Sequence, residues 1–373
     1  MMTPTPVLLA LALTAAPAEP IKVGALMSVT GPAAFLGAPE ARTLEMLVEE
    51  LNQKGGVAGR KLQLVVKDTG GDPAKAISFA KQLIEEEQVF AIIGPPTSGE
   101  TMAVKAVAQE SRTLLLSCAA AEAIVSPVAP WVFKTAQKDS HAIVKLFGQM
   151  KRMGVTRIGL LSSNTGFGKA GKEQIAKLAP EHGIQIVADE VYDKAATDLT
   201  AEVTKLKAAK VQAILNWSIE PAQAIVIKNA RQIGLTVPIF QSHGFANIQY
   251  VKAAGAAAEG VIFPASRIVV AEALPDGHPQ KAVLVAYKKA YESRYHEDAS
   301  AFGGYAHDAL GILVKAIQTA GVDREKVRAA VEGMKGYVGT SGVFTFAPAD
   351  HNGLDVDAFE MVTVKDGKFV LAK

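Results

Sequence analysis

The sequence has little of several features that mark other classes of protein. It contains one cysteine, Cys118, in 373 residues, and its formal net charge is +2 with no long run of one sign. An internal disulfide is therefore excluded, and nothing in the charge pattern favours binding to nucleic acid or to an anionic membrane surface. The seven histidines show no HxxxH or HExxH spacing, so no metal site is expected. Cys118 itself is expected to be a buried, unreactive thiol at the end of a strand.

Long hydrophobic runs are also scarce. An apolar run extends from Val7 to Ala16, and the small-x-small pattern Ala16-Pro17-Ala18 that ends it can be cut by signal peptidase before Glu19. The run is shorter than the ~20 residues that a membrane-spanning helix needs. No Lys or Arg precedes it, which departs from the usual signal peptide. We predict that residues 1–18 are a cleaved signal peptide and that the mature chain is periplasmic.

What the sequence does have is a regular alternation of short β-branched runs with longer amphipathic stretches. Hydrophobic residues make up 49 % of the chain and charged residues 20 %, which suits a folded globular protein. The expected strands are Ile21–Met27, Leu62–Asp68, Ala91–Ile93, Thr113–Ser117, Arg157–Ser162, Ile184–Glu190, Ala213–Asn216 and Ile239–Ser242. The expected helices are Glu40–Gln53, Pro73–Glu87, Glu100–Glu110, His141–Met153, Lys169–His182, Leu199–Ala209, Ala222–Gly234 and Phe302–Thr319.

This alternation predicts an α/β fold with parallel sheets and helices on both faces. The elements are too many for one compact sheet, so two doubly wound lobes are expected. His307 and Asp308 fall inside the last helix, where a surface or packing role is expected. In open parallel sheets, ligands bind beyond the carboxyl ends of the strands. Candidate binding residues are therefore sought in Ser28–Gly37, Gly94–Gly99, Cys118–Ile124, Ser163–Gly168, Trp217–Glu220 and His243–Asn247.

Five segments, found together and in this order, resemble the branched-chain amino-acid binding family of periplasmic solute-binding proteins. They are Gly24–Gly37 (GALMSVTGPAAFLG), Asn52–Gly59 (NQKGGVAG), Asp68–Pro73 (DTGGDP), Ile92–Thr101 (IIGPPTSGET) and Gly353–Val364. The resemblance covers essentially the whole chain. It implies a type I periplasmic binding fold, in which two lobes are joined by three crossing strands and close on the ligand by a hinge motion. It places lobe 1 at residues 19–135 and 266–345, and lobe 2 at residues 136–265 and 346–373.

By the same resemblance, Ser98 donates its hydroxyl to the ligand carboxylate, and Ala119 supplies backbone groups. A helix N-terminus with free N–H groups beside a hydroxyl also favours an anion on physical grounds. An ordinary helix-capping role is the alternative for Ser98. Thr97, Ile219 and Leu36 complete this part of the candidate ligand site.

Three positions depart from the family pattern, and each loses a group that would accept a hydrogen bond from an ammonium. Ala121 stands where the family has Thr, Phe167 where it usually has Tyr, and His243 where it usually has an acidic residue. A buried charge without partners is severely disfavoured. A ligand with a carboxylate but no ammonium fits better, and a neutral or protonated His243 can donate to it.

Aromatic side chains indicate what else the ligand carries. Phe167, Trp217, Phe35 and Phe302 can supply its apolar walls. We therefore expect an aromatic or other apolar monocarboxylate, such as a benzoate- or phenylpropenoate-like acid. The alternative is a branched-chain or other apolar amino acid whose amine meets backbone carbonyls or Glu220.

A further motif points to a different class of protein. Residues Gly166–Gly171 read GFGKAG, a GxGxxG between a strand and a helix, and Asp189 and Glu190 follow near the spacing of the ribose-binding acid of dinucleotide enzymes. In the true fingerprint, however, the first glycine comes directly off the strand, whereas three residues intervene here. A nicotinamide cofactor is also not expected outside the cytoplasm. A dinucleotide-dependent enzyme is therefore only the remote alternative.

The expected function is transport without catalysis. The expected partners are a small carboxylate and the membrane permease subunits of an ABC importer, and the protein is expected to be a monomer without cofactor. A sensor built on the same fold would normally carry a transmembrane or DNA-binding segment, and the sequence shows neither.

Overall fold

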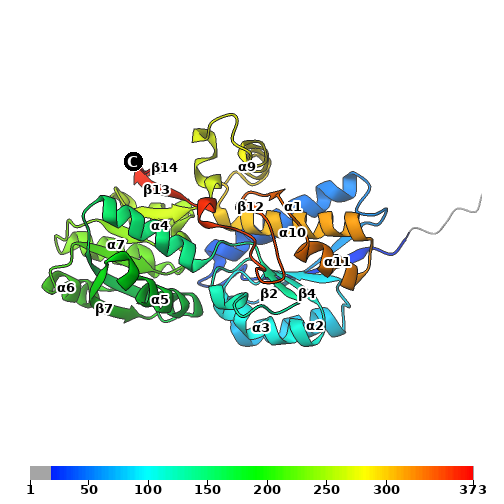
Figure 1. Ribbon diagram of the computed structural model, residues 1–373, viewed down its shortest axis with the longest axis horizontal. Helices are drawn as coiled ribbons and strands as arrows, with labels where there is room; N and C mark the ends of the chain where they lie inside the picture. Colours follow the sequence, from blue (N-terminus) through cyan, green and yellow to red (C-terminus); the bar gives the residue numbers. More distant parts are fainter. Residues whose placement is uncertain (1–17, 373) are drawn as a thin grey trace, which may run out of the picture.

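Two β-sheets, each covered by helices, form two lobes that lie side by side along the long axis of the molecule (Figure 1). The computed structural model describes residues 18–372. Apart from Ala18, the predicted signal peptide lies outside the described residues, so its cleavage stays a prediction. Within residues 18–372, no helix combines the length and the apolar character needed to cross a membrane.

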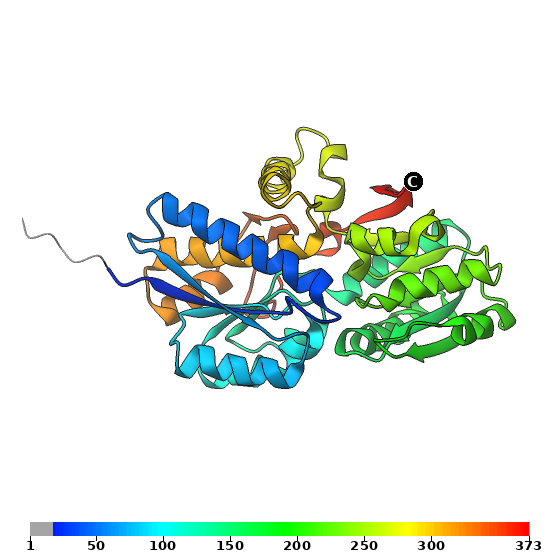
Figure 2. The same ribbon diagram turned by 180° about the vertical axis from the view of Figure 1, so that it is seen from behind.

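Lobe 1 is built on a five-stranded parallel sheet in the order β2-β1-β3-β4-β5. Its strands are β1 (Ile21–Met27), β2 (Leu62–Asp68), β3 (Ala91–Ile93), β4 (Leu114–Ser117) and β5 (Val132–Lys134). One face is covered by α2 (Pro73–Glu85) and α3 (Ser98–Glu110), and the other by α1 (Ala34–Gln53), α10 (Ala301–Ala320) and α11 (Arg324–Glu332) (Figures 1 and 2). A short hairpin of β11 (Tyr337–Val338) and β12 (Val343–Phe344) follows α11.

The strands of this sheet alternate between two buried cores. Ala25 and Leu116 belong to the core shared with α1 and α10, whereas Leu26 and Leu115 belong to the core shared with α2 and α3. Successive strand residues point to opposite faces, and helices cover both faces of this parallel sheet. The inner strands β3 and β4 are therefore apolar up to Ser117, whereas the edge strand β2 carries polar residues as well.

Lobe 2 is built on a seven-stranded sheet in the order β14-β13-β10-β9-β8-β6-β7, in which β13 runs antiparallel to both of its neighbours. Its strands are β6 (Arg157–Ser163), β7 (Gln185–Tyr192), β8 (Ala213–Trp217), β9 (Ile239–Gln241), β10 (Ile262–Ala265), β13 (Glu360–Lys365) and β14 (Lys368–Leu371). Its helices are α4 (Asp139–Arg152), α5 (Gly166–Leu178), α6 (Thr200–Ala208), α7 (Ala222–Gln232) and α8 (Ile248–Ala254).

The chain passes between the lobes three times, after β5, after β10 and before β13. Asn352 fastens the first crossing, because its Nδ2 donates to the carbonyls of Lys134 (3.3 Å) and Ala136 (2.8 Å). After the second crossing, α9 (Lys281–Tyr295) projects away from both sheets (Figures 1 and 2). The predicted fold of two doubly wound α/β lobes is confirmed. The residues at which each lobe begins and ends stay a prediction.

Helix α1 begins six residues before its predicted start at Glu40, and it continues through Pro39. Proline has no N–H, so the carbonyl of Phe35, four residues earlier, lacks its usual partner within the helix. This carbonyl instead accepts a hydrogen bond from Nδ2 of Asn247 in lobe 2, at 2.9 Å. The ring of Phe35 also packs edge-on against Tyr250 of lobe 2, with 5.1 Å between ring centroids. The hydrogen bond that α1 lacks at Pro39 thus leaves the Phe35 carbonyl free for a contact between the lobes.

Candidate functional site

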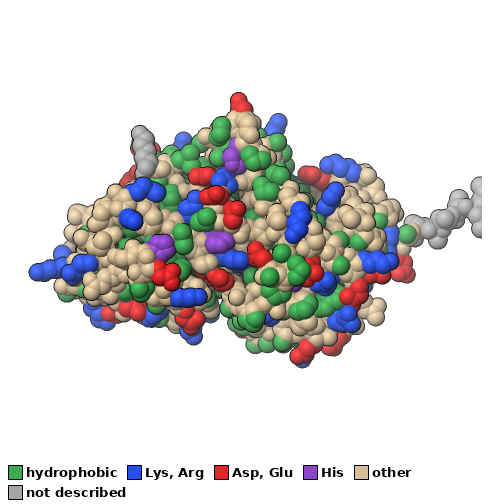
Figure 3. All heavy atoms as spheres, viewed as in Figure 1, with side chains coloured by type: hydrophobic (Ala, Val, Ile, Leu, Met, Phe, Trp, Pro, Cys, Tyr) green, Lys and Arg blue, Asp and Glu red, His purple; other side chains and the backbone are tan. Residues whose placement is uncertain are grey.

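The cleft between the lobes is closed where α3 and α5 begin. Gly99 in the first turn of α3 faces Gly166, the first residue of α5, so closely that a Cβ on Gly166 would lie 2.7 Å from the Cα of Gly99. In Figure 3 the lobes meet at a notch in the lower outline of the molecule. The structure therefore holds the two lobes against each other.

A small inner pocket lies between the lobes, with a cavity volume of about 20 Å³. Small-molecule sites usually have roughly 300–1,000 Å³. The side chains of the two lobes therefore fill most of this space, and the lobes must move apart for a ligand to enter. Both lobes contribute to its wall, and each lining residue is buried. The lining residues are Leu36, Pro96, Ser98, Cys118, Ala120, Phe302 and Tyr305 from lobe 1, and Phe167, Ile219, His243 and Gly244 from lobe 2.

Six of the eleven predicted site residues meet in this inner pocket. They are Ser98, Leu36, Phe167, Ile219, His243 and Phe302. Ala121 lies directly beside them, because its N–H donates to Oγ of Ser98 at 3.1 Å. Ser98 is the first residue of α3, and Thr97 caps that helix by accepting from the N–H of Glu100 at 3.3 Å. Thr97, and not Ser98, therefore caps α3. Ser98 instead lines the inner pocket.

The remaining predicted site residues lie elsewhere. Thr97 lines a separate outer pocket nearer to solvent. Ala119 packs in the core under α2 and α3, and its N–H donates to Oγ of Ser117 at 3.1 Å. Trp217 is wholly buried behind Phe167, with 5.6 Å between the stacked rings, so it supports the pocket wall without lining it. Phe35 lies at the contact with Tyr250 and not at the inner pocket, because the turn of α1 that carries it faces α8.

A group of buried ionisable residues behind the inner pocket was not predicted. Lys134 ends β5, and Asp139 begins α4 just after the first crossing; neither side chain is exposed. Nζ of Lys134 donates to the carbonyls of Gln137 (3.1 Å) and of the pocket residue Ala120. Burial lowers the pKa of Lys134 and raises the pKa of Asp139, because each charge is taken out of water.

His243 connects this group to the pocket. Its Nε2 lies 3.8 Å from Oδ1 of Asp139, which is beyond hydrogen-bonding distance. Burial, together with the positive charge of Lys134, lowers the pKa of His243 to about 3. The imidazole is therefore neutral at physiological pH, and the protonated form that the sequence left open is disfavoured.

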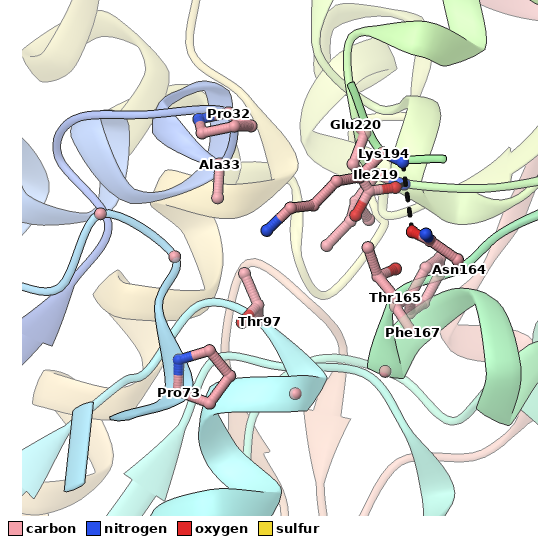
Figure 4. A pocket seen from close by; sticks show the side chains of 14 residues that line it. Pro32, Ala33, Pro73, Thr97, Asn164, Thr165, Phe167, Lys194, Ile219 and Glu220 are labelled. Carbon is pink, nitrogen blue, oxygen red and sulfur yellow. Dashed lines mark hydrogen bonds between the residues drawn. The ribbon is translucent and has the colours of Figure 1, made fainter. Parts of the chain in front are cut away.

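The outer pocket lies between the lobes and shares Phe167 and Ile219 with the inner one (Figure 4). Lys194 extends from lobe 2 into this space, while its backbone N–H donates to Oδ1 of Asn164 at 3.2 Å. Glu220 also lines the outer pocket, and its Oε2 accepts from Oγ of Ser218 at 2.6 Å and from the N–H of Ile219 at 3.2 Å. Glu220 therefore does not stand in the inner pocket, where the amino-acid alternative would need it.

The GxGxxG motif has a packing explanation. Gly166 faces Gly99 across the cleft, a Cβ on Gly168 would meet the carbonyl of Ser163, and a Cβ on Gly171 would meet the indole of Trp217. The acids that were compared with a ribose-binding residue form ion pairs, Asp189 with Lys172 (2.9 Å) and Glu190 with Lys205 (2.8 Å). The close contacts of each glycine account for the motif without a nucleotide.

Two α/β lobes that meet around a buried pocket define a two-lobed binding-protein architecture. The sequence matches the periplasmic binding protein family over residues 20–368, so the chain belongs to that family. The resemblance seen in the sequence is thereby confirmed. Among the described residues, no three or more His, Cys, Asp or Glu side chains lie together in a way that could bind a metal ion.

Individual proteins are similar to this chain in sequence or in fold. The leucine-, isoleucine-, valine-, threonine- and alanine-binding protein of Pseudomonas aeruginosa is 26 % identical over 318 residues, which are 84 % of this chain and 82 % of that protein. An extracellular ligand-binding receptor from Rhodopseudomonas palustris HaA2 is 27 % identical with a TM-score of 0.89, covering 95 % of this chain and 99 % of that one. An ABC-transporter solute-binding protein from R. palustris, solved with benzoate, has a TM-score of 0.83 at 22 % identity over 94 % of this chain and 95 % of that one, which shows the fold alone.

Proposed function

We propose that this protein is the periplasmic solute-binding component of an ABC importer, and that its lobes close on an aromatic or other apolar monocarboxylate. The protein performs no reaction and works as a monomer that delivers its ligand to membrane permease subunits. The hinge lies at the three crossings, with lobe 1 at residues 19–135 and 266–345 and lobe 2 at residues 136–265 and 346–373. Family membership supports the transport role.

One observation carries the choice of ligand. None of the described residues that line the inner pocket is acidic, whereas Ser98 presents a hydroxyl there at the start of α3. The first N–H groups of a helix and a nearby hydroxyl favour an anion. An ammonium would find no carboxylate among the lining residues, and the charge of Asp139 behind His243 is offset by Lys134, so enclosing the ammonium would carry a severe cost in free energy. Phe167, Phe302 and Leu36 supply the apolar remainder of the wall.

An apolar amino acid is the second candidate. It is favoured by the Pseudomonas relative, which is a binding protein for five amino acids by its name. In this chain the amine would have to meet backbone carbonyls, because Glu220 lies in the outer pocket. The R. palustris protein that was solved with benzoate shows that a protein of this fold holds an aromatic acid.

A thermal-shift screen separates the two candidates. Benzoate and phenylpropenoate are expected to raise the melting temperature by roughly 3–4 °C at a hundredfold excess over Kd, because a ligand that binds only the folded state stabilises it by mass action. Leucine, isoleucine and valine are expected to leave it unchanged. If only the amino acids raise the melting temperature, the proposal of a carboxylate ligand without an amine is rejected, while the fold and the transport role are unaffected.

Replacing Ser98 with alanine is expected to weaken binding of the carboxylate ligand by about tenfold, since a hydrogen bond to a charged group contributes about 1.5–3 kcal/mol. Isothermal titration calorimetry on the wild type and the variant measures the change. Thr97→Ala is the matched control, because Thr97 caps the same helix from outside the inner pocket. An unchanged Kd in Ser98→Ala would remove this hydroxyl from the site.

A further inference from the structure

The lobe 2 side of the inner pocket contains a histidine whose hydrogen-bonding groups are unused. His243 is 2 % exposed and is held edge-on by Phe167, Trp217 and Phe359, with ring centroids 5.4–5.6 Å apart. Neither of its ring nitrogens has a hydrogen-bond partner within residues 18–372. The aromatic contacts fix the ring in place, so its nitrogens cannot turn to solvent.

The carboxylate of Asp139, next to His243, also lacks hydrogen-bond partners. Both carboxylate oxygens are buried, and no donor for either is found in the described part of the chain. The gap of 3.8 Å to His243 is too long for the two to satisfy each other directly. Buried polar groups are almost always hydrogen-bonded, because leaving one without a partner costs free energy. The two unpartnered nitrogens of His243 at the wall of the inner pocket, with the carboxylate of Asp139 behind them, therefore indicate a group that this chain does not supply.

The charges of Lys134, Asp139 and His243 indicate which ligand group binds next to His243. Lys134 and Asp139 have opposite signs, and the neutral form of His243 adds no charge, so the end has no net charge to offset an ammonium or a carboxylate. A neutral imidazole offers one donor and one acceptor, and the carboxyl group of Asp139 offers further acceptors. A hydroxyl group both donates and accepts, so it matches this pair.

We propose that His243 and Asp139 form a polar recess that receives a hydroxyl group of the ligand, so that the preferred ligand is a hydroxy-substituted aromatic acid. The inference rests on the proposed function and makes its ligand class narrower. The carboxylate then lies at Ser98 in lobe 1 and the hydroxyl at His243 in lobe 2. One ligand thereby contacts both lobes through polar groups.

Calorimetric titration of benzoate and of its 2-, 3- and 4-hydroxy derivatives tests this proposal. The best hydroxy isomer is expected to bind the wild type at least about tenfold more tightly than benzoate. His243→Phe keeps the aromatic contacts with Phe167, Trp217 and Phe359 and removes both nitrogens. In that variant the preference is expected to fall to within about twofold, and the Kd of benzoate itself is expected to change because His243 lines the inner pocket.

Ser98→Ala is the control, because it weakens benzoate and the hydroxy acids by the same factor and leaves the preference intact. His243→Leu replaces the Phe variant if the latter fails to fold by its melting temperature. Equal affinities of the wild type for benzoate and all three isomers would mean that a fixed water occupies the recess, and this outcome overturns the proposal. A preference that survives removal of the imidazole also overturns it. Benzoate binding then still supports the proposed function, whereas binding of no acid at all refutes both.

Discussion

Replacing Gly166 with alanine is expected to weaken ligand binding by about 30-fold or more. The added Cβ would lie 2.7 Å from the Cα of Gly99 and 2.8 Å from its backbone nitrogen. Both atoms are backbone atoms of the opposite lobe, so no flexible side chain can move aside. Overpacking at a rigid contact costs typically about 1–3 kcal/mol, and here the cost falls on the closed state alone. Calorimetry measures the loss of affinity, and small-angle scattering with and without ligand measures closure.

The facing glycine provides the control. A Cβ on Gly99 would lie 3.8 Å from the nitrogen of Gly166, which is an ordinary van der Waals distance. Gly99→Ala therefore adds the same methyl group to the same contact, and its Kd is expected to stay within about threefold of the wild type. Both residues lie in the first turn of a helix, where alanine is well tolerated. If the two substitutions change Kd by the same factor, the closer approach at Gly166 has no effect. The contact between the two glycines then does not limit closure.

Replacing Asp308 with alanine is expected to lower the free energy of unfolding by about 3 kcal/mol. Asp308 is wholly buried in α10, and its carboxylate accepts from the N–H groups of Thr340 and Ser341, both at 2.7 Å, and from Oγ1 of Thr340 at 3.1 Å. Nδ1 of His307 lies 3.0 Å from Oδ1. Hydrogen bonds to a charged group contribute about 1.5–3 kcal/mol each, and donors left without a partner add to the loss. Urea denaturation followed by circular dichroism measures the change.

Asp323→Ala is the matched control for this stability measurement. Asp323 also accepts from backbone, through the N–H of Lys326 at 2.9 Å, but it is an exposed cap at the start of α11. Its loss is expected to cost about 1 kcal/mol. If Asp308→Ala costs no more than this, the buried carboxylate does not anchor the segment that leads to the third crossing.

The alternation of apolar runs and amphipathic stretches was sufficient to predict eight of the twelve strands in the two large sheets, but not β5, β10, β13 or β14. The central parallel strands are buried on both faces and their sequences are mostly apolar, so Leu114–Ser117 and Ala213–Trp217 are found close to the predicted ends. Helix α9 was not predicted, because only three of its residues are buried and its periodicity is correspondingly weak. The start of α1 was placed too late, at Glu40, because the helix continues through Pro39, a residue type that normally stands only in the first turn of a helix.

The candidate site was predictable only where one segment carries both the motif and the pocket-facing residue. Ser98, Phe167 and His243 each follow a strand at the carboxyl edge of a sheet, which is where ligands bind in such folds. Lys134 and Asp139 were missed because charged residues usually lie at the surface and neither residue falls inside a predicted strand or helix. Only the crossing between lobes buries them. Tyr305 lies three residues after Phe302 on the same helix, and this helical spacing is a signal that would have found it.

The hydrogen bond from Asn247 to the carbonyl of Phe35 has a consequence for how tightly any ligand is held. Because it joins the lobes without touching the inner pocket, it stabilises the closed state whether or not a ligand is present. Apparent affinity is the intrinsic affinity of the closed state multiplied by the fraction of molecules that are closed. A change in this contact therefore rescales every dissociation constant by one common factor and leaves the ranking of ligands unchanged. The proline inside α1 thus sets how readily the protein retains its ligand, while the pocket sets which ligand is chosen.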